Sequence, residues 1–479
     1  MSVYGLKLLL LTIFAISCFV VVHKNLFFVG FGKKAVVFWL AMLPFMLLLN
    51  NQLLTLVAAF SLLFFLNRNH SPAITVAFFI LTVSAVPDWV DYRMSAPGIN
   101  YLLQLSYDKI AVLALLAPLV MTVYKRSNVP WNATDSFVVA FVLLATLLTF
   151  REGLLTSVMR FLATSIIIYI IPYFVISRTI SSVDDLRYCS LAFLMLAILL
   201  SAILLISQAL QIDIYEAFNP RSVANITREY RGGFLRLSGP VIGVIVSFLM
   251  LCGVLALDAL KRHRLVPVFV YWPLIATFGL CVVFSGSRAG LFSFIMGIGV
   301  YAFFTKLTGT GRVLCSAVLL IFTILEYGFD LTSFLVYEDE YGTFDYRSEL
   351  YKTSWLYLEQ NFLFGSPFYM TSGYFDHLVT GLGIIDIVSA YLQVALEYGY
   401  VGLLFFVSIY LSVIYPLFKR LLATISNHDA DDERVLYTAM YFTLNVMMAF
   451  ILTTTSMISY FPIFMMINIA IGRSLLVAR

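Results

Sequence analysis

Residues 266–305 read VPVFVYWPLIATFGLCVVFSGSRAGLFSFIMGIGVYAFFT, two apolar runs joined by a short polar segment that ends at Arg288. Each run is long enough to cross roughly 30 Å of hydrocarbon as an α-helix that rises about 1.5 Å per residue. A guanidinium group between two such helices costs several kcal/mol unless an anion, a carboxylate or water receives it. Arg288 is therefore a candidate functional residue, and the question is which anion it faces.

The composition of the whole chain agrees with a membrane protein. Of the 479 residues 61% are hydrophobic and 12% are charged, and the mean hydropathy is +0.95. A soluble globular protein of this length would need far more polar surface. No alternation typical of a closed barrel is visible, so we expect an all-α polytopic bundle.

The apolar runs predict about fourteen or fifteen transmembrane helices in a single membrane domain over residues 1–479. The first run lacks a small-residue cleavage site after it, so we interpret it as a helix and not as a signal peptide. The runs are 5–22, 35–49, 52–66, 72–87, 107–124, 134–150, 157–177, 188–209, 239–258, 266–284, 290–305, 313–329, 390–418, 434–453 and 457–472.

All five cysteines lie inside apolar runs and form no CxxC pair, so we expect neither disulfides nor a metal site. They are Cys18, Cys189, Cys252, Cys281 and Cys315.

Basic residues fall on alternate connections between the runs, and the positive-inside rule assigns those connections to the cytoplasm. They are Lys125-Arg126, Arg178, Arg187, Lys261-Arg262-His263-Arg264, Lys306, Arg312, Lys419-Arg420, Arg473 and Arg479. The opposite, extracytoplasmic side then carries two short turns, 151–153 and 285–288, and two long loops, 211–238 and 330–389.

The two long loops differ in charge. The first has a modest cationic excess, from Arg221, Arg228, Arg231 and Arg236. The second is acidic, and its segment 346–364 places Leu350, Trp355, Leu358 and Phe362 at helical spacing. This spacing predicts an amphipathic helix at the outer membrane interface. Long loops with their own helix are usually functional.

Three arginines stand where we expect a helix to begin. Arg236 precedes the run at 239–258, Arg288 precedes the run at 290–305, and Arg347 opens the amphipathic helix. Unpaired backbone N–H groups at a helix start can hold phosphate oxygens together with a guanidinium group. The plainer interpretation is that such arginines reach lipid headgroups or pair with nearby acids.

Three segments together resemble the O-antigen ligase and O-antigen polymerase superfamily. They are Arg236-Leu-Ser-Gly239-Pro240, Ser285-Gly-Ser-Arg288-Ala-Gly290-Leu291, and Tyr391-Leu-Gln393-Val-Ala-Leu-Glu397-Tyr-Gly399-Tyr-Val-Gly402. The resemblance covers roughly residues 205–415, with the long second loop between the second and third segments. The motifs are weak one by one, and their order makes them specific.

The resemblance implies a multi-pass enzyme of the bacterial cytoplasmic (inner) membrane that transfers glycan from an undecaprenyl-diphosphate-linked donor to an acceptor outside the cytoplasm. Arg236, Arg288 and Arg347 would then hold the diphosphate. No metal or other cofactor is implied, because fixed guanidinium groups can stabilise the leaving diphosphate. Besides the lipid bilayer, a chain-length regulator and a flippase are candidate partners, and no nucleic acid is expected.

One position departs from the ligase branch of that superfamily. Ligases commonly carry His-Asn just before the third motif, with the histidine as the base, whereas this chain has Val388-Ser389. This difference favours a polymerase that joins lipid-linked repeat units by metal-independent inverting transfer. A ligase acting on lipid A core or another acceptor is the alternative. A transporter of the lipid-linked glycan is the second alternative. Such transporters usually carry charged residues at the membrane midplane and are built from two related halves, and neither feature is evident in this sequence.

Two residues are candidates for the group that takes the proton from the acceptor hydroxyl. Histidine is a natural general base, which makes His377 a candidate. His377 stands beside Asp376, however, as solvated surface histidines often do. Asp386 lies two residues before Val388, the position at which ligases carry the histidine. A carboxylate there can also simply stabilise the start of the following helix.

Overall fold

The computed structural model describes residues 30–49, 51–96, 99–126, 129–211, 215, 230–231, 234–237, 239–261, 268–329, 343–379, 384–427 and 433–477. The predicted helix at 5–22, Cys18 and most of the first long loop, with Arg221 and Arg228, lie outside these residues.

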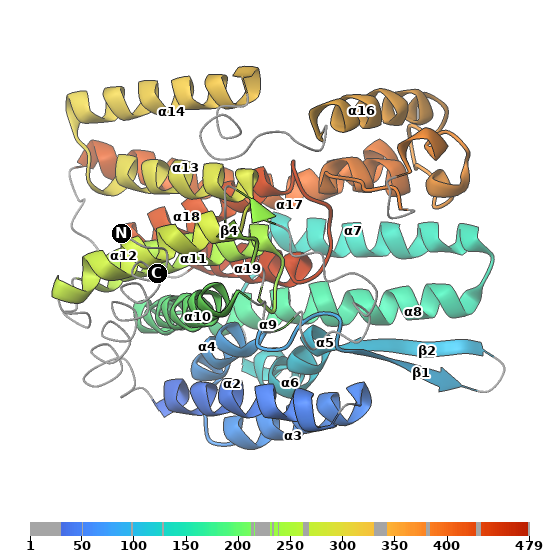
Figure 1. Ribbon diagram of the computed structural model, residues 1–479, viewed down its shortest axis with the longest axis horizontal. Helices are drawn as coiled ribbons and strands as arrows, with labels where there is room; N and C mark the ends of the chain where they lie inside the picture. The colour runs from blue at the N-terminus through green and yellow to red at the C-terminus, as the bar shows by residue number, and fades with distance from the viewer. Residues whose placement is uncertain are drawn as a thin grey trace.

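The chain is a polytopic bundle of helices, as its composition predicts (Figure 1). In the described part of the chain, eight helical segments are long and apolar enough to cross a membrane, and five shorter apolar helices accompany them. The helices are α2 (Gly30–Leu49), α3 (Gln52–Asn67), α4 (Pro72–Thr82), α5 (Tyr107–Ala111), η1 (Val112–Leu116), α6 (Ala117–Arg126), α7 (Ala133–Thr149), η2 (Phe150–Glu152), α8 (Leu155–Ser165), η3 (Ile166–Ile170), α9 (Ile171–Thr179), α10 (Val183–Leu210), α11 (Gly243–Lys261), α12 (Val268–Phe284), α13 (Arg288–Thr305), α14 (Gly309–Phe329), α16 (Thr343–Gln360), η5 (Tyr369–Thr371), η6 (Asp376–Leu378), α17 (Ala390–Asn427), α18 (Glu433–Ile451) and α19 (Phe461–Val477).

Short polar residues set several of the helix starts. Asn132 and Asp135 form a reciprocal capping box at α7, and Ser182 and Asp185 form another at α10. In each box the side chains satisfy backbone N–H groups that the first turn of a helix leaves without partners. Apolar runs alone would not fix these boundaries to a residue.

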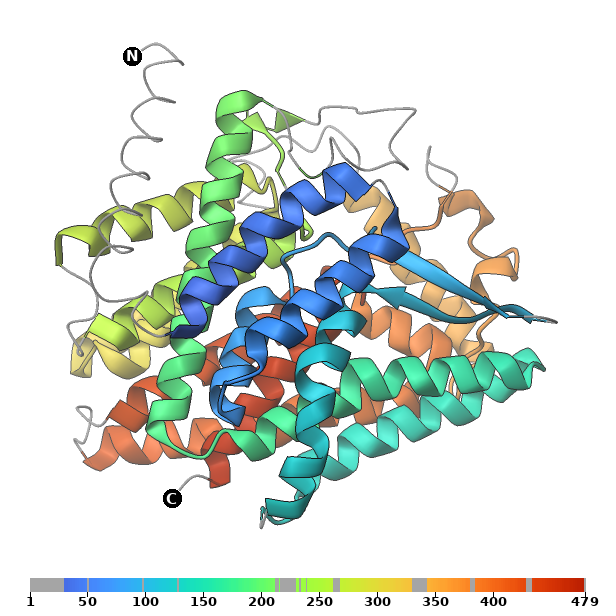
Figure 2. The ribbon, with the colours of Figure 1, turned by 90° about the horizontal axis from the view of Figure 1, so that it is seen from below.

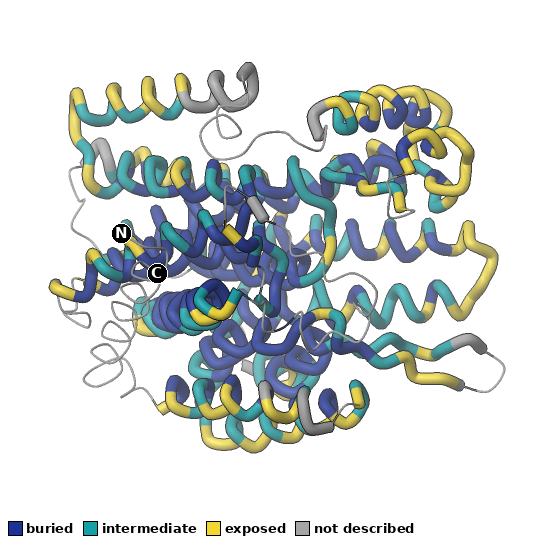
Figure 3. Tube along the Cα trace, in the orientation of Figure 1, coloured by how far each residue is buried: buried dark blue, intermediate teal, exposed yellow. Residues whose placement is uncertain are grey.

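The buried centre of the bundle is built around α10, α11, α18 and α19. Figure 3 shows their traces as mostly buried, whereas α3 and α14 at the periphery carry many exposed positions. Figure 2 shows α10 crossing the other helices at a steep angle, and it packs on both α4 and α11. Exposed apolar side chains on the outer helices, such as Phe65, Leu314 and Val318, suit a lipid-facing surface.

One hairpin of strands departs from the expected helix-only pattern. Strands β1 (Asp91–Ala96) and β2 (Ile99–Ser106) pair antiparallel and run beside α8 toward the same end of the molecule (Figure 1). The guanidinium of Arg160 on α8 lies 3.7 Å from the centre of the Tyr101 ring and donates to the Tyr101 carbonyl. The sequence signal for this hairpin was the alternation of polar and apolar residues on either side of Pro97-Gly98.

The basic residues of alternate connections gather at one end of the bundle. Arg187 at the start of α10 pairs with Glu433 at the start of α18 (3.1 Å), and Lys306 after α13 pairs with Asp258 near the end of α11 (2.8 Å). Arg420 on α17 donates to the carbonyl of Leu475 on α19. The assignment of this end to the cytoplasm stays a prediction.

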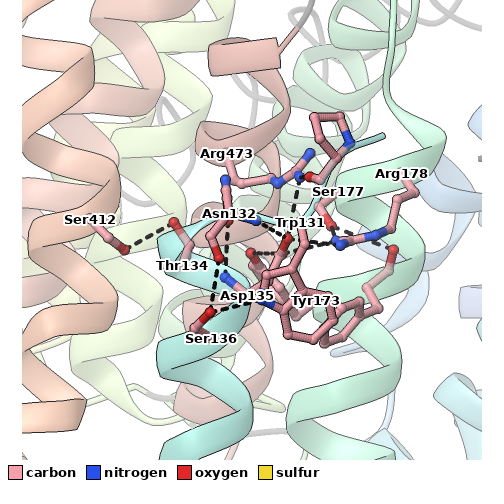
Figure 4. Close-up of polar contacts among 12 residues, drawn as sticks. Trp131, Asn132, Thr134, Asp135, Ser136, Tyr173, Ser177, Arg178, Ser412 and Arg473 are labelled. Carbon is pink, nitrogen blue, oxygen red and sulfur yellow. Dashed lines mark hydrogen bonds and ion pairs between the residues drawn. The ribbon is translucent and has the colours of Figure 1, made fainter. Parts of the chain in front are cut away.

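A buried ion network ties three helices together at this basic end (Figure 4). The Asp135 carboxylate on α7 lies 2.9 Å from Arg178 on α9 and 3.4 Å from Arg473 on α19, and it accepts a hydrogen bond from Tyr173 (2.6 Å). Asp135 and Arg473 are fully buried, and Arg473 also donates to the Pro130 carbonyl (2.7 Å). One carboxylate thus balances two buried guanidinium groups.

Asp135→Ala should lower the free energy of unfolding by about 3–5 kcal/mol, because it leaves two guanidinium groups buried without their shared carboxylate. Thermal unfolding of the detergent-solubilised protein measures the loss. Asp184→Ala is the matched control, since Asp184 is largely exposed and pairs with Arg187 on the same helix. That exposed pair is worth at most about 1 kcal/mol. Equal melting temperatures for the two variants would contradict the structural role of the network.

Candidate functional site

The Arg288 turn is built by buried serines and a glycine at the junction of α12 and α13. Gly286 has φ 62°, a left-handed conformation that glycine adopts without strain. Ser287 caps α13 by accepting a hydrogen bond from the Gly290 N–H (3.1 Å). Arg288 is the first residue of α13, as predicted, and it is half-buried. Arg288 therefore lies at a helix N-terminus, where the backbone favours an anion.

A backbone hydrogen bond draws the Arg236 segment against this turn. The Leu237 N–H donates to the Phe284 carbonyl (3.0 Å), and the Phe234 ring lies 5.3 Å from the Phe284 ring, centre to centre. The two arginine-bearing segments, 48 positions apart at Leu237 and Ser285, are thus neighbours. The structure brings the Arg236 segment beside the turn that leads to Arg288, and a shared role in binding a diphosphate stays a prediction.

Two expected helix starts are wrong. Helix α11 begins at Gly243, so Arg236 lies in an extended segment after strand β4 (Phe234–Leu235), which pairs with β3 (Tyr230–Arg231). Helix α16 begins at Thr343, so Arg347 lies in its second turn. Only Arg288 combines its charge with the backbone N–H groups of a first turn. The apolar runs located the helices but not the polar residues that precede them.

Arg347 and Asp386 are brought together by Tyr346. The Tyr346 hydroxyl donates to the Asp386 carbonyl (3.0 Å) and accepts a hydrogen bond from the Asp386 N–H (2.9 Å). Lost solvation against the protein raises the pKa of the Asp386 carboxyl above its usual value, and the positive charge of Arg347 partly opposes this rise. Asp386 itself remains exposed, so its carboxylate is open to an incoming hydroxyl.

His377 occupies a different part of the same unit. It is an exposed residue of the short helix η6, and its Nε2 lies 3.3 Å from the Thr353 hydroxyl. Thr353 and Tyr346 are seven residues apart on α16, about 10 Å along the helix axis. His377 and Asp386 therefore meet α16 at separate places and do not form an acid–base pair.

All five predicted site residues lie at one end of the bundle, opposite the basic end. Phe292, one turn after Arg288, stacks 4.8 Å from Phe450 at the end of α18. The Ala390 N–H at the start of α17 donates to the Leu452 carbonyl just beyond α18 (2.9 Å), and the Tyr351 hydroxyl on α16 donates to Thr453 (3.5 Å). The end of α18 thus joins α13, α16 and α17.

The amphipathic helix forms, and its apolar face differs in part from the predicted one. Leu350 and Leu358 are buried in a small core between α16, η5, η6 and the start of α17. Trp355 and Phe362 are 62% and 51% exposed. The segment 343–379 therefore packs as a unit on the bundle end, which helical spacing alone did not reveal.

Arg151, which sequence reasoning left without a role, fastens this unit to the bundle. Its guanidinium donates to the carbonyls of Phe364 (2.9 Å), Gly365 (2.7 Å) and Glu397 (2.9 Å), and its Nε donates to Leu148 (2.9 Å). These carbonyls belong to the end of the α16 segment, to α17 and to α7. We call this contact the Arg151 clasp.

A glycine in the third motif makes the clasp feasible. Helix α17 breaks at Gly399, which has φ 68°. The Tyr400 N–H donates to the Phe362 carbonyl (2.7 Å), and a Cβ at Gly399 would overlap the Leu363 carbonyl. The backbone at Gly399 thus packs closely against the chain after α16.

Gly399→Ala should abolish this packing and strongly reduce the amount of folded protein, because it combines a steric overlap with an unfavourable φ. We expect a loss above about 3 kcal/mol, measured by thermal unfolding and by membrane abundance. Gly279→Ala in α12 is the matched control, since nothing lies within 4 Å of a Cβ there. That variant should keep or slightly gain stability. A Gly399→Ala variant as stable as Gly279→Ala would show that the break in α17 is not required.

The described residues hold no group of three or more histidine, cysteine, aspartate or glutamate side chains that could bind a metal ion. Cys189, Cys252 and Cys281 are buried, as expected of cysteines in apolar runs, and Cys315 is half-buried.

One comparison with known proteins identifies the region that contains this site. Residues 272–407, from α12 into α17, match the family model described as O-antigen ligase. Arg288, Arg347, His377 and Asp386 lie inside the match, and Arg236 lies outside it. No curated protein and no solved structure matches the chain. The members of this family are membrane glycosyltransferase-like enzymes. Within residues 272–407 the match supports the resemblance to the O-antigen ligase and O-antigen polymerase superfamily.

Proposed function

We propose that this protein polymerises undecaprenyl-diphosphate-linked oligosaccharide units on the outer face of the bacterial cytoplasmic membrane. The observation that carries the proposal is the hydrogen bond between Leu237 and Phe284, which brings the segments of Arg236 and Arg288 together. Two guanidinium groups beside a helix N-terminus suit a diphosphate held at the membrane surface. Arg347 and Asp386 lie at the same end of the bundle.

The leaving-group side of the reaction follows from charge. Breaking the bond between the anomeric carbon and the diphosphate builds negative charge on the diphosphate oxygens. Arg236 and Arg288 would stabilise this charge in fixed positions, with the N–H groups that open α13 as further donors. The transfer would invert the anomeric carbon and release undecaprenyl diphosphate.

Asp386 is the better candidate for the acceptor side. Its carboxylate is exposed, lies near the Arg347 guanidinium, and has a pKa above the ordinary value. A carboxylate that is more basic than usual is better suited to take the proton of an attacking hydroxyl. His377 lies farther along α16, at Thr353, and remains the second candidate.

The residues at the position where ligases carry histidine and asparagine, Val388 and Ser389, favour a polymerase. In this chain Val388 is half-buried and Ser389 is buried, and the Ser389 hydroxyl accepts a hydrogen bond from the Leu392 N–H (3.4 Å). Ser389 therefore lies at the start of α17 as a capping residue. A base would have to come from elsewhere, and Asp386 is three residues before it.

Arg288→Lys tests the diphosphate-binding role. Lysine keeps the charge but loses the planar, bidentate fork, so we expect polymer formation to fall at least about tenfold. In the assay, purified protein is incubated with synthetic lipid-linked repeat units, without metal or nucleotide. The lengths of the products are then measured as a ladder. Arg68→Lys, at an exposed position after α3, is the matched control. A normal ladder from Arg288→Lys would remove this residue from the site.

The same assay separates the rival functions by product. Polymer that stays on the undecaprenyl carrier supports a polymerase, and polymer on lipid A core or another acceptor supports a ligase. Movement of unmodified lipid-linked glycan across vesicles, without any new glycosidic bond, would support a transporter.

Asp386→Asn tests the acceptor side. If Asp386 takes the proton, the rate of the normal protein should rise with pH as this carboxyl group loses its proton. The midpoint should lie above the usual aspartate value of about 3.9, because the pKa of Asp386 is raised. Asp386→Asn should lower the rate by about 100-fold and remove this rise. A pH profile with an unchanged acidic limb would exclude Asp386 as the base.

A further inference from the structure

A cavity of about 160 Å³ lies between α7, the α8–η3 junction and α17, apart from the arginines of the proposed donor site. Five polar side chains line it, and they are Ser165, Tyr169, Gln393, Glu397 and Tyr398. The remaining walls are apolar or aromatic. None of the roles assigned above uses this cavity.

The cavity lies near the ends of the helices that form it. Ala145, in its wall, is four residues before the end of α7, and Glu397 is two residues before the break in α17 at Gly399. The Glu397 side chain is half-buried among apolar and aromatic residues. A carboxylate in such surroundings is costly and is a candidate functional group. Glu397 forms no ion pair with any residue that the structure describes.

Gln393 gives this carboxylate a fixed neighbour. The Met457 N–H donates to the Gln393 Oε1 (3.0 Å), which directs the Gln393 Nε2 toward the Glu397 Oε1 (3.2 Å). The Tyr398 hydroxyl also hydrogen-bonds this carboxylate. Each carboxylate oxygen can accept more than one hydrogen bond, and the Gln393 amide has a second N–H to donate, so the pair can take a further partner. A side-by-side acceptor and donor of this kind match two neighbouring hydroxyl groups, which can each donate and accept.

Aromatic rings form the facing wall. The Phe141 ring lies 6.0 Å from the Tyr398 ring and 6.4 Å from the Tyr169 ring, centre to centre, in edge-to-face arrangements. Rings with an apolar face and, in tyrosine, a polar tip suit a ligand with both C–H faces and hydroxyl groups. A metal cation fits less well, because it needs several oxygen ligands and Met457 already occupies the Gln393 oxygen.

The geometry points to a sugar-binding subsite, in which Glu397 and Gln393 hold neighbouring hydroxyl groups of one ring of the acceptor glycan. This inference rests on the proposed function. Helix α17 contacts α18 on one flank and α7 on the other, and α18 in turn contacts α13, which begins at Arg288. Helix α17 therefore carries the cavity wall and is joined through α18 to the helix that begins at Arg288. The acceptor would bind in this cavity while the donor diphosphate binds at the arginines.

Glu397→Gln keeps the shape of the side chain and removes its charge. We expect it to raise the KM for the acceptor unit at least about tenfold and to leave the KM for the donor within about twofold. Steady-state rates with the full-length purified protein measure both constants. Glu359→Gln, at an exposed position on α16, is the matched control and should change neither. An acceptor KM equal to that of the control would overturn the inference.

Ala145→Phe tests the same cavity without touching its charge. The buried Ala145 side chain lines the cavity, so a phenylalanine there should fill it and raise the acceptor KM as well. Should this larger residue prevent folding, Glu397→Gln still decides the question.

A binding measurement separates this inference from the proposed function. Saturation-transfer NMR would use methyl glycosides of glucose, galactose and N-acetylglucosamine with the detergent-solubilised protein. We expect contact with at least one glycoside that is lost in Glu397→Gln and kept in Glu359→Gln. Such binding without any polymer formation would support the sugar-binding subsite and contradict the polymerase function. Polymer formation without any Glu397-dependent binding or KM effect would support the polymerase function and contradict the subsite.

Discussion

The Arg151 clasp is the constraint on which the candidate site depends. Arg151 reaches from the end of α7 to carbonyls of the α16 segment and of α17, three parts of the chain that no local pattern connects. Backbone carbonyls without partners are costly next to a membrane, and a break in a helix creates them. The clasp satisfies these groups and thereby fixes α16, which carries Tyr346 and Arg347, over the end of the bundle.

The two ends of the bundle use their charges differently. At the basic end, Asp135, Asp258 and Glu433 each pair with cations across helices, so charge there holds the helices together. At the other end, Arg236 and Arg288 stand on non-helical or first-turn backbone, and Asp386 is exposed. The described ion pairs of this kind across helices therefore stabilise the basic end, and the site that we propose lies at the other end.

Sequence alone could predict the helices and the Arg288 turn, because apolar runs and their polar interruptions are local signals. It could not predict the clasp, since Arg151 lies 213 to 246 residues from the carbonyls it binds. The break at Gly399 was equally hidden, because the run 390–418 reads as one continuous apolar helix. The hairpin at 91–106 was missed although its alternation was visible. The common cause is that the hydrophobicity of each residue indicates whether it is buried, whereas a backbone contact between distant segments leaves no local pattern in the sequence.

The break at Gly399 also links the frame to the cavity. Glu397 lies two residues before it, and its carbonyl is held by Arg151 while its side chain lines the cavity. A continuous helix would keep that carbonyl inside its own ladder and leave Arg151 without this partner. The same glycine therefore fixes the position of α16 and opens the backbone beside the Glu397 carboxylate. The function that we propose joins two lipid-linked substrates, and this requires two binding places at a constant separation. Because α17 carries Glu397 and packs on α18, which contacts α13, the broken helix would hold the cavity at a fixed distance from the Arg288 turn.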